Sequence, residues 1–177
     1  VNDPALINRA EIIREKGTDR SQFLRGAVDK YTWRDVGSSF LPGELIAAFL
    51  RAQLEQADQL TERRLAKWRM YYELLTPLQN DGLLRLPIVP DHCDHNAHMF
   101  YVLLHESIDR QFVLDFLKSR GILAVFHYVP LHSSPAGQRF GRTHGALDVT
   151  SRLSERLVRL PLWVDLSEDA LVDVVEA

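Results

Sequence analysis

The chain has 177 residues, a length that suits one domain of ordinary size or one domain with an appendage. Hydrophobic residues make up 46% and charged residues 25%, which is typical of a globular protein with a buried core. The formal net charge is -3 and the basic residues form no run, so the sequence gives no electrostatic reason to expect nucleic acid or an anionic membrane as a partner.

The cysteine content and the apolar segments indicate where the protein works. Cys93 is the only cysteine, so an internal disulfide is impossible and a reducing cytoplasm is expected. The longest uncharged apolar stretch, residues 122–126, is far too short to span a bilayer. The chain begins at Val1 with neither an initiator methionine nor a leader, which favours a segment cut from a longer protein.

The N-terminal part of the chain predicts one helix and one long loop. Asn2 or Asp3 can cap a helix that runs to about Lys16 and ends at Gly17. The loop, residues 18–39, has no clear period, and its aromatic residues are of a kind that is usually buried, so we expect an ordered and functional loop. These aromatic residues are Phe23, Tyr31 and Trp33.

The strongest periodic signal predicts one long helix over residues 43–75. Pro42 is placed to open this helix and Pro77 to follow its end. A helix of this length is typical of a connection between two domains. Its apolar stripe consists of Leu45, Phe49, Ala52, Leu60, Trp68, Tyr71 and Leu75.

The remainder of the chain alternates between strand and helix patterns. The predicted strands are 83–88, 97–104 and 122–128, with a short extended piece at 160–162. The predicted helices are 109–120, 148–158 and one that begins after Ser167, and a loop is expected over 130–145. In the helix 109–120 the residues expected on the buried face are Phe112, Val113, Phe116 and Leu117. The fold class is therefore α/β, with a small C-terminal layer whose sheet is antiparallel or mixed.

A cluster of possible metal ligands lies in one turn. His92, Cys93, His95 and His98 fall within seven positions and could be drawn as a zinc site. The spacing matches no standard zinc site, because no second pair of ligands stands at a distance. Asp91 and Asp94 make the stretch typical of a solvated turn, and we expect no metal here.

Two other stretches carry candidate binding residues. His127 and His132 straddle the end of an apolar strand, where α/β proteins often present functional side chains, and imidazole suits hydroxyl- and phosphate-rich ligands. The alternative is a pair of histidines whose hydrogen bonds are made by the backbone, and the residues alone do not decide between the two. The residues Gly37-Ser38-Ser39 precede a predicted helix and could bind a phosphate or form an ordinary capping turn.

Taken together, these segments resemble the C-terminal part of the nucleotide-sugar aminotransferases that depend on pyridoxal 5'-phosphate. The resemblance follows nearly the whole chain, and the matching motifs stand in the family's order. They are Asn2-Asp3-Pro4, residues 14–17, residues 35–40, Ala47-Ala48, Gln53-Leu54, Arg63-Arg64, residues 98–101, residues 121–132, Ser154-Glu155-Arg156 and Leu160-Pro161-Leu162.

The resemblance implies the C-terminal part of an aspartate-aminotransferase-like fold of type I. Residues 1–41 would be the tail of the large cofactor-binding domain, 42–76 the interdomain helix, and 77–177 the small α/β domain. A member of this family would be a homodimer that moves an amino group from L-glutamate to the keto carbon of a nucleotide sugar. Residues 14–33 and 37–40 are most similar to the branch that aminates a dTDP-linked 4-keto-6-deoxy sugar for enterobacterial common antigen.

The resemblance also assigns roles to residues of this chain. Ser39 would contact the cofactor phosphate of the neighbouring subunit, where most relatives have Asn, and Leu41 stands where they have Arg. His127 and His132 would bind the nucleotide-sugar substrate.

The Schiff-base lysine of the family would lie just before Val1, so no catalytic residue is assigned within the chain. The lysines present are Lys16, Lys30, Lys67 and Lys118, and none has the family's Ser-x-x-x-Lys context. The chain alone is therefore predicted to bind cofactor poorly and to be inactive. The alternatives are a non-catalytic binding or assembly module of the same fold, and a sugar dehydratase relative that lacks the lysine.

Overall fold

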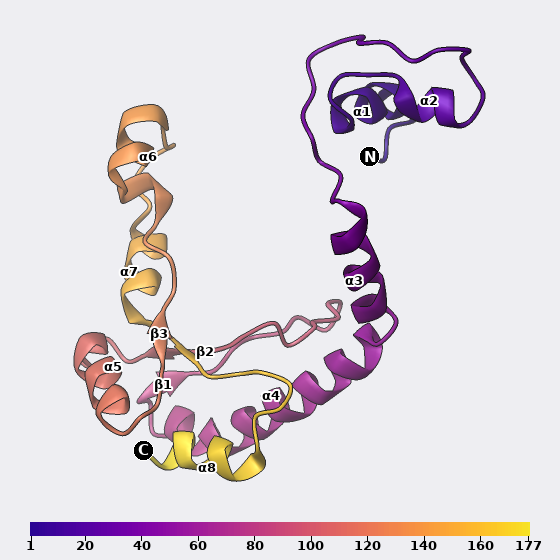
Figure 1. Cartoon of the computed structure of the whole chain (residues 1–177). Coiled ribbons are helices and arrows are strands. Elements are labelled where there is room, and N and C mark those ends of the chain that lie inside the picture. Colours follow the sequence, from indigo (N-terminus) through magenta and orange to yellow (C-terminus); the bar gives the residue numbers. More distant parts are fainter. The chain divides into compact units, whose positions relative to one another are not determined.

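A computed structural model describes all 177 residues, Val1–Ala177 (Figure 1). The chain forms two compact units, Val1–Gln56 and Ala57–Ala177. No helix in it combines the length and the apolar character needed to cross a membrane. The three-part division expected from the family resemblance stays a prediction.

The first unit begins with the predicted N-terminal helix. A single 3-10 turn, η1 (Pro4–Leu6), leads into α1 (Ile7–Arg14). The Asp3 carboxylate accepts a hydrogen bond from the Ala5 N–H at 2.9 Å, which confirms Asp3 as the cap. Gly17 follows with φ +73°, and a Cβ there would lie 1.7 Å from the Asp35 carbonyl oxygen, so only glycine can make this turn.

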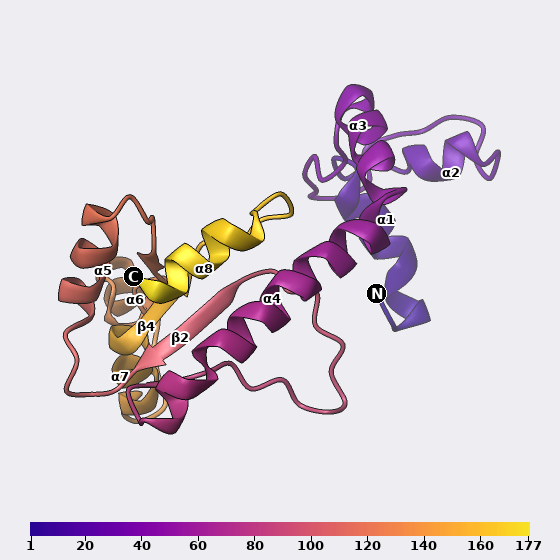
Figure 2. The same ribbon diagram turned by 90° about the horizontal axis from the view of Figure 1, so that it is seen from below.

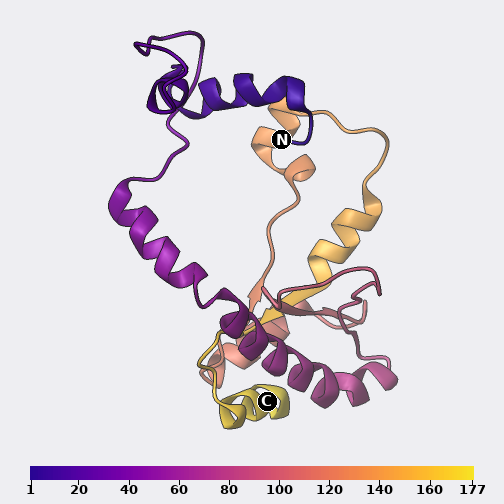
Figure 3. The ribbon, with the colours of Figure 1, turned by 90° about the vertical axis from the view of Figure 1, so that its right-hand side faces the viewer.

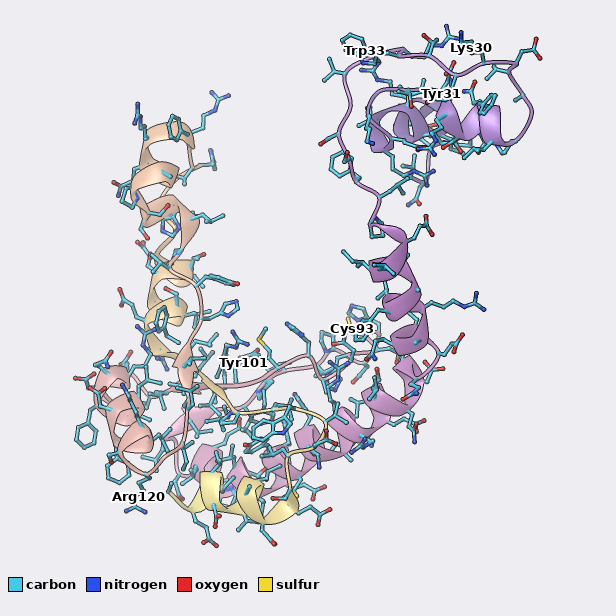
Figure 4. The ribbon with its side chains drawn as sticks, viewed as in Figure 1. Lys30, Tyr31, Trp33, Cys93, Tyr101 and Arg120 are labelled. Atoms are coloured by element: carbon cyan, nitrogen blue, oxygen red, sulfur yellow. The ribbon has the colours of Figure 1, made fainter.

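The segment 18–39 differs from the prediction in two ways. It contains a short helix, α2 (Arg20–Leu24), and its aromatic side chains are not buried. Trp33 is 73% exposed, and Figure 4 shows Tyr31 and Trp33 on the loop that follows α2. The first unit has no buried apolar side chain, and hydrogen bonds order its loop instead.

Asp19 makes two of the hydrogen bonds that order this loop. Its buried carboxylate accepts from the Thr32 N–H at 2.6 Å and from the Arg34 guanidinium, so the start of α2 is tied to residues 32–34. The Thr32 N–H and then the Arg34 side chain lower the pKa of Asp19 below its ordinary value. Because hydrogen bonds to one carboxylate order this loop, its sequence has no apolar periodicity from which the order could be predicted.

The prediction of one helix over residues 43–75 is wrong. Two helices occur, α3 (Glu44–Leu54) in the first unit and α4 (Ala57–Asn80) in the second. Between them the Gln56 N–H bonds to the Gln53 carbonyl, a tighter i to i−3 bond that ends α3. Pro77 lies inside α4 rather than after it, in the last turn, where it removes one i to i−4 hydrogen bond near the end of the helix.

The second unit is built on a four-stranded sheet with the order β1-β2-β4-β3. Every neighbouring pair is antiparallel, which confirms the α/β fold class with an antiparallel sheet. The strands are β1 (Leu84–Arg85), β2 (Phe100–Leu104), β3 (Val125–Phe126) and β4 (Leu157–Leu160). The predicted strands are in the right places but too long, and β4 was predicted as the end of a helix followed by an extended piece.

Two of the helices that follow α4 are capped as the sequence predicts. The helical segments after α4 are α5 (Arg110–Ser119), η2 (Leu131–Ser133), α6 (Pro135–Phe140), α7 (Asp148–Arg156) and α8 (Glu168–Glu176). Asp109 caps α5 and Ser167 caps α8, both as predicted. The turn η2 and the helix α6 occupy the region predicted as a loop, and α8 lies beside α4 (Figure 2).

The buried face of α5 was predicted only in part, since Leu117 is buried and Val113 packs against the core as expected. Leu114 and Leu117 are buried, whereas Phe112 is 68% exposed and Phe116 is 38% exposed. The two phenylalanines instead stack on each other along the outer face, 6.2 Å apart. Helical spacing alone predicts that the phenylalanines are buried. In the folded unit the leucines are the residues of α5 that are buried.

Aromatic side chains from α4 and β2 form the centre of the core. Tyr71 and Phe100 are fully buried with ring centroids 5.0 Å apart, and Trp68 packs edge-on against Phe100 at 5.4 Å. The Tyr71 hydroxyl donates to the Pro161 carbonyl at 2.9 Å, so α4 is tied to the segment after β4. Burial raises the pKa of Tyr71 above its ordinary value.

Alkaline pH is expected to destabilise the protein through Tyr71. An unfolded tyrosine loses its proton near pH 10, whereas the folded Tyr71 keeps it to higher pH. The stabilisation is therefore complete below about pH 10 and is lost as the pH rises from that value towards the raised folded pKa. Urea denaturation between pH 8 and pH 11 should show a smaller loss of stability for Tyr71→Phe than for the wild type, and an equal loss in both would contradict this role.

Candidate functional site

One cavity of the second unit is lined by His127, one of the two predicted histidines. It has a volume of about 430 Å³ and lies where the end of β3, the start of α5 and the helix α7 meet. Figure 3 shows the chain leaving β3, forming α6 and returning through α7. The lining residues are Arg110, Gln111, Phe126, His127, Tyr128, Val129, Pro130, Ser133, Ser151, Ser154 and Glu155.

His127 stands directly in this cavity with a nitrogen that the protein does not satisfy. Its Nδ1 atom is inaccessible to solvent and has no hydrogen-bond partner. The ring lies edge-on to Tyr128, with centroids 4.9 Å apart. A buried polar atom without a partner is costly, and other atoms of the residue line the cavity, which makes His127 a candidate contact for a hydroxyl or a phosphate of a ligand.

His132 does not line this cavity but bonds to a residue that does. Its Nε2 atom is 3.2 Å from the Ser151 hydroxyl, and Ser151 lines the cavity. The structure thus links His132 to the cavity of His127 through Ser151, which the sequence analysis missed. A serine in a polar helix gives no sequence signal for such a contact, because its partner lies nineteen residues away.

Arg110 is a second residue that the sequence analysis missed. It is the first residue of α5, its guanidinium donates to the Ser154 carbonyl, and it lies 5.6 Å above the Phe126 ring. These contacts hold a permanent positive charge at the cavity wall. With Glu155 and the serine hydroxyls, the wall offers both donors and acceptors, as a ligand rich in hydroxyl groups and phosphate requires.

Ser39 belongs to the first unit and lines a different cavity, of about 400 Å³. Its neighbours there include Arg14, Lys16 and Arg20, together with Leu41 at the position where the resemblance expects Arg. Arg20 is paired with Glu15 at 3.3 Å, and Lys16 forms no ion pair. Glu15 and Glu44 also line this cavity, so Ser39 and Lys16 are the groups there that fit the phosphate of a cofactor.

The histidine-rich turn contains no metal-binding arrangement. No group of three or more histidine, cysteine, aspartate or glutamate side chains in the chain is placed to hold a metal ion. His95 instead packs against Trp68, with ring centroids 4.5 Å apart, and Cys93 is exposed. One histidine of the turn therefore contributes to the aromatic core.

The model of the DegT/DnrJ/EryC1/StrS aminotransferase family matches residues 1–177, and the chain belongs to that family.

Individual relatives agree with this assignment. The chain is 29% identical to the dTDP-3-amino-3,4,6-trideoxy-alpha-D-glucose transaminase of Micromonospora megalomicea, over 83% of this chain and 39% of that protein. It is 27% identical to a pleiotropic regulatory protein of Geobacillus stearothermophilus, over 99% of this chain and 44% of that protein. The chain thus spans less than half the length of these relatives.

Solved structures have the same fold. DesV of S. venezuelae, determined in complex with a ketimine intermediate, superposes with a TM-score of 0.80 at 26% identity, over 99% of this chain and 44% of that one. PseC of Helicobacter pylori, an aminotransferase of pseudaminic acid biosynthesis by its description, gives a TM-score of 0.80 at 20% identity, over 99% of this chain and 46% of that one. The fold is therefore that of the corresponding part of these aminotransferases.

Proposed function

We propose that this chain is part of a cytoplasmic aminotransferase that moves an amino group from L-glutamate to a 4-keto-6-deoxy nucleotide sugar. The observation that carries the proposal is the cavity lined by His127, by the fixed Arg110 and by Ser151, which bonds to His132. Such a wall suits the hydroxyls and the diphosphate of a nucleotide sugar.

The nucleotide of the substrate is proposed to be dTDP. Two relatives named for dTDP sugars are 29% and 27% identical to the chain, and one named for a UDP sugar is 25% identical. The similarity of residues 14–33 and 37–40 to the enterobacterial common antigen branch supports the same choice. A spore coat polysaccharide biosynthesis protein of Bacillus subtilis, also 25% identical, supports a role in making surface polysaccharide.

Pyridoxal 5'-phosphate is the proposed cofactor. When bound, it supplies the electron sink that lets an amino group leave one carbon and join another. In this chain Ser39, with Arg14 and Lys16 beside it, would hold the phosphate. His127 and His132 would orient the sugar nucleotide, and Arg110 would offset its negative charge.

A homodimer is proposed because α3 has an uncovered apolar face. Leu45 is 89% exposed, Phe49 is 71% exposed and Ile46 is 64% exposed within the chain. Apolar side chains gathered along one helix are typical of a surface that another protein segment covers. The neighbouring subunit is the proposed source of part of that cover.

Removing the held histidine is expected to weaken sugar binding. In the complete gene product, His132→Ala should raise KM for the nucleotide sugar about tenfold, the effect of about one lost hydrogen bond to a charged ligand. Ser151→Ala should raise it about threefold, because His132 remains but is no longer held. KM for L-glutamate should stay unchanged in both variants, as measured by steady-state kinetics.

Ser119→Ala is the matched control, since Ser119 lies outside the cavity and its hydroxyl donates to the Phe116 carbonyl in the same helix. It should leave both KM values within about twofold of the wild type, as expected for a weak local hydrogen bond. An unchanged KM for the sugar in His132→Ala would remove this histidine from substrate binding.

A further inference from the structure

Two backbone segments of the first unit touch at a pair of glycines, Gly17 and Gly37. A Cβ added at Gly37 would lie 2.1 Å from the Gly17 nitrogen and 2.8 Å from the Ile13 carbonyl oxygen. Real Cβ atoms essentially never come closer than 3.0 Å to another heavy atom. The segment that contains Gly37 therefore crosses the end of α1 at a distance that only glycine permits.

Hydrogen bonds on both sides of this glycine crossing fix its register. The Ser38 N–H donates to the Ile13 carbonyl at 2.9 Å, and the Lys16 N–H donates to the Ser38 carbonyl at 3.1 Å. The next residue, Ser39, stands opposite Glu15 in an antiparallel bridge. The position of Ser39 is therefore set by the way in which its segment pairs with the end of α1.

Lys16 holds a backbone conformation that is uncommon for a residue with a side chain. Its φ is +59°, in the left-handed region, and the next residue, Gly17, has φ +73°. Strain of this kind persists only where the surrounding structure enforces it, and it clusters at functional sites. The bond from the Lys16 N–H to the Ser38 carbonyl belongs to the glycine crossing, so the crossing also holds Lys16 in its strained conformation.

Lys16 and Ser39 line the same cavity, which has a volume of about 400 Å³. No ion pair of the chain includes Lys16. Of the two acidic residues in the wall, Glu15 is paired with Arg20 at 3.3 Å, and Glu44 lies in the first turn of α3, where the helix dipole stabilises its charge. An ammonium group without a counter-ion, beside a hydroxyl, suits a phosphate.

We propose that the glycine crossing positions Ser39 and Lys16 for the phosphate of the cofactor. The inference rests on the proposed function, in which that phosphate binds at Ser39. Gly17 and Gly37 touch no ligand and act through the two residues that they position. An alanine methyl at position 37 needs about 1 Å more room than the crossing gives, which would push Ser39 away from the end of α1. Binding groups have to be held within about 0.5 Å of their working geometry, so the phosphate contact would be weakened.

The test compares pyridoxal 5'-phosphate with pyridoxal, which lacks the phosphate. Both are titrated into the cofactor-free complete gene product, and binding is followed by absorbance. Gly37→Ala should weaken binding of pyridoxal 5'-phosphate at least about tenfold, the effect of a lost hydrogen bond to a charged group. Binding of pyridoxal should stay within about twofold of the wild type, because no phosphate contact is involved. Equal weakening of both ligands, or of neither, would overturn the proposal.

A double-mutant cycle separates this inference from the proposed function. Ser39→Ala alone should weaken binding of pyridoxal 5'-phosphate about tenfold. Gly37→Ala should weaken binding less in the Ser39→Ala background than in the wild type, because the hydroxyl that it displaces is already gone. Independent effects of the two substitutions would overturn the positioning role and leave the cofactor contact of Ser39 intact. No effect of Ser39→Ala would overturn that contact, and the positioning role with it.

Gly26→Ala is the control for a loss of stability. It places a methyl group at φ +73° with no atom within 4 Å, so it strains the chain without displacing Ser39. It should lower the melting temperature of the cofactor-free protein but leave binding of pyridoxal 5'-phosphate within about twofold of the wild type. A loss of binding as large as that in Gly37→Ala would assign both losses to stability and overturn the proposal.

Lys16→Gly keeps the proposal testable if Gly37→Ala does not fold. Glycine adopts φ +59° without strain, so this variant should melt at about the wild-type temperature. It should bind pyridoxal 5'-phosphate about tenfold more weakly, because the ammonium group is gone, and pyridoxal as the wild type does. Unchanged binding of pyridoxal 5'-phosphate by Lys16→Gly would show that Lys16 is not positioned for the phosphate and overturn the proposal.

Discussion

Replacing Tyr71 by alanine is expected to lower the free energy of unfolding of residues 57–177 by about 4 kcal/mol, as for other fully buried aromatic side chains. Tyr71 is 0% exposed and packs against Phe100, and its hydroxyl donates to the Pro161 carbonyl. The substitution therefore removes a packed ring and leaves a buried carbonyl without its partner. The change is a large part of the total stability of an ordinary domain, so urea denaturation should detect it directly.

Two variants give this prediction its controls. Tyr71→Phe keeps the ring and removes only the hydroxyl, so it should cost about 1–2 kcal/mol, the value of one buried hydrogen bond. Phe112→Ala removes a ring that is 68% exposed on the outer face of α5, so it should cost less than about 1 kcal/mol. Equal losses from Phe112→Ala and Tyr71→Ala would contradict the assignment of the core to α4 and β2.

The second large effect concerns catalysis by the 177 residues alone. Supplied with pyridoxal 5'-phosphate, L-glutamate and a dTDP-linked 4-keto sugar, they are expected to form no amino sugar above the uncatalysed rate. Enzymes of ordinary efficiency exceed that rate by at least about a millionfold, so the difference is easily measured. The reason is that no lysine of the chain has the sequence context of the lysine that binds the cofactor. The lysines present are Lys16, Lys30, Lys67 and Lys118.

The control is the same reaction with the complete gene product, which should yield the amino sugar, identified by its mass. Product formed by the 177 residues alone would contradict the prediction. In that case, single Lys→Ala substitutions at the four positions would show which side chain carries the cofactor.

Local signals in the sequence predict the ends of the elements well. The caps at Asp3, Asp109 and Ser167 and the turn at Gly17 depend on a few neighbouring residues, and all of them form as expected. The alternation of strands and helices likewise predicts the α/β class. These features need no knowledge of distant contacts.

Features that depend on distant contacts are the ones the sequence does not reveal. The break between α3 and α4 has neither proline nor glycine to mark it, and the aromatic residues of α5 have helical spacing but face outward. In both cases the pattern of the helix is correct and the packing partner decides the outcome. The same reason explains the exposed aromatics near Tyr31, where a hydrogen-bonded carboxylate replaces an apolar core.

The candidate site likewise contains residues that the sequence predicts and residues that it does not reveal. His127 and His132 are singled out by their position after a strand, and in the structure His127 lines the cavity while His132 is linked to it through Ser151. Ser151 and Arg110 belong to α7 and α5. Tertiary packing brings these residues together, so their sequence surroundings carry no signal.

The most direct test of the proposed function is the identity of the product made by the complete gene product. The enzyme would be incubated with pyridoxal 5'-phosphate, ¹⁵N-labelled L-glutamate and dTDP-4-keto-6-deoxyglucose, and the sugar analysed by mass spectrometry. The account predicts a dTDP-amino sugar that carries the ¹⁵N label. An unchanged sugar, or a sugar that has lost water and gained no nitrogen, would contradict it.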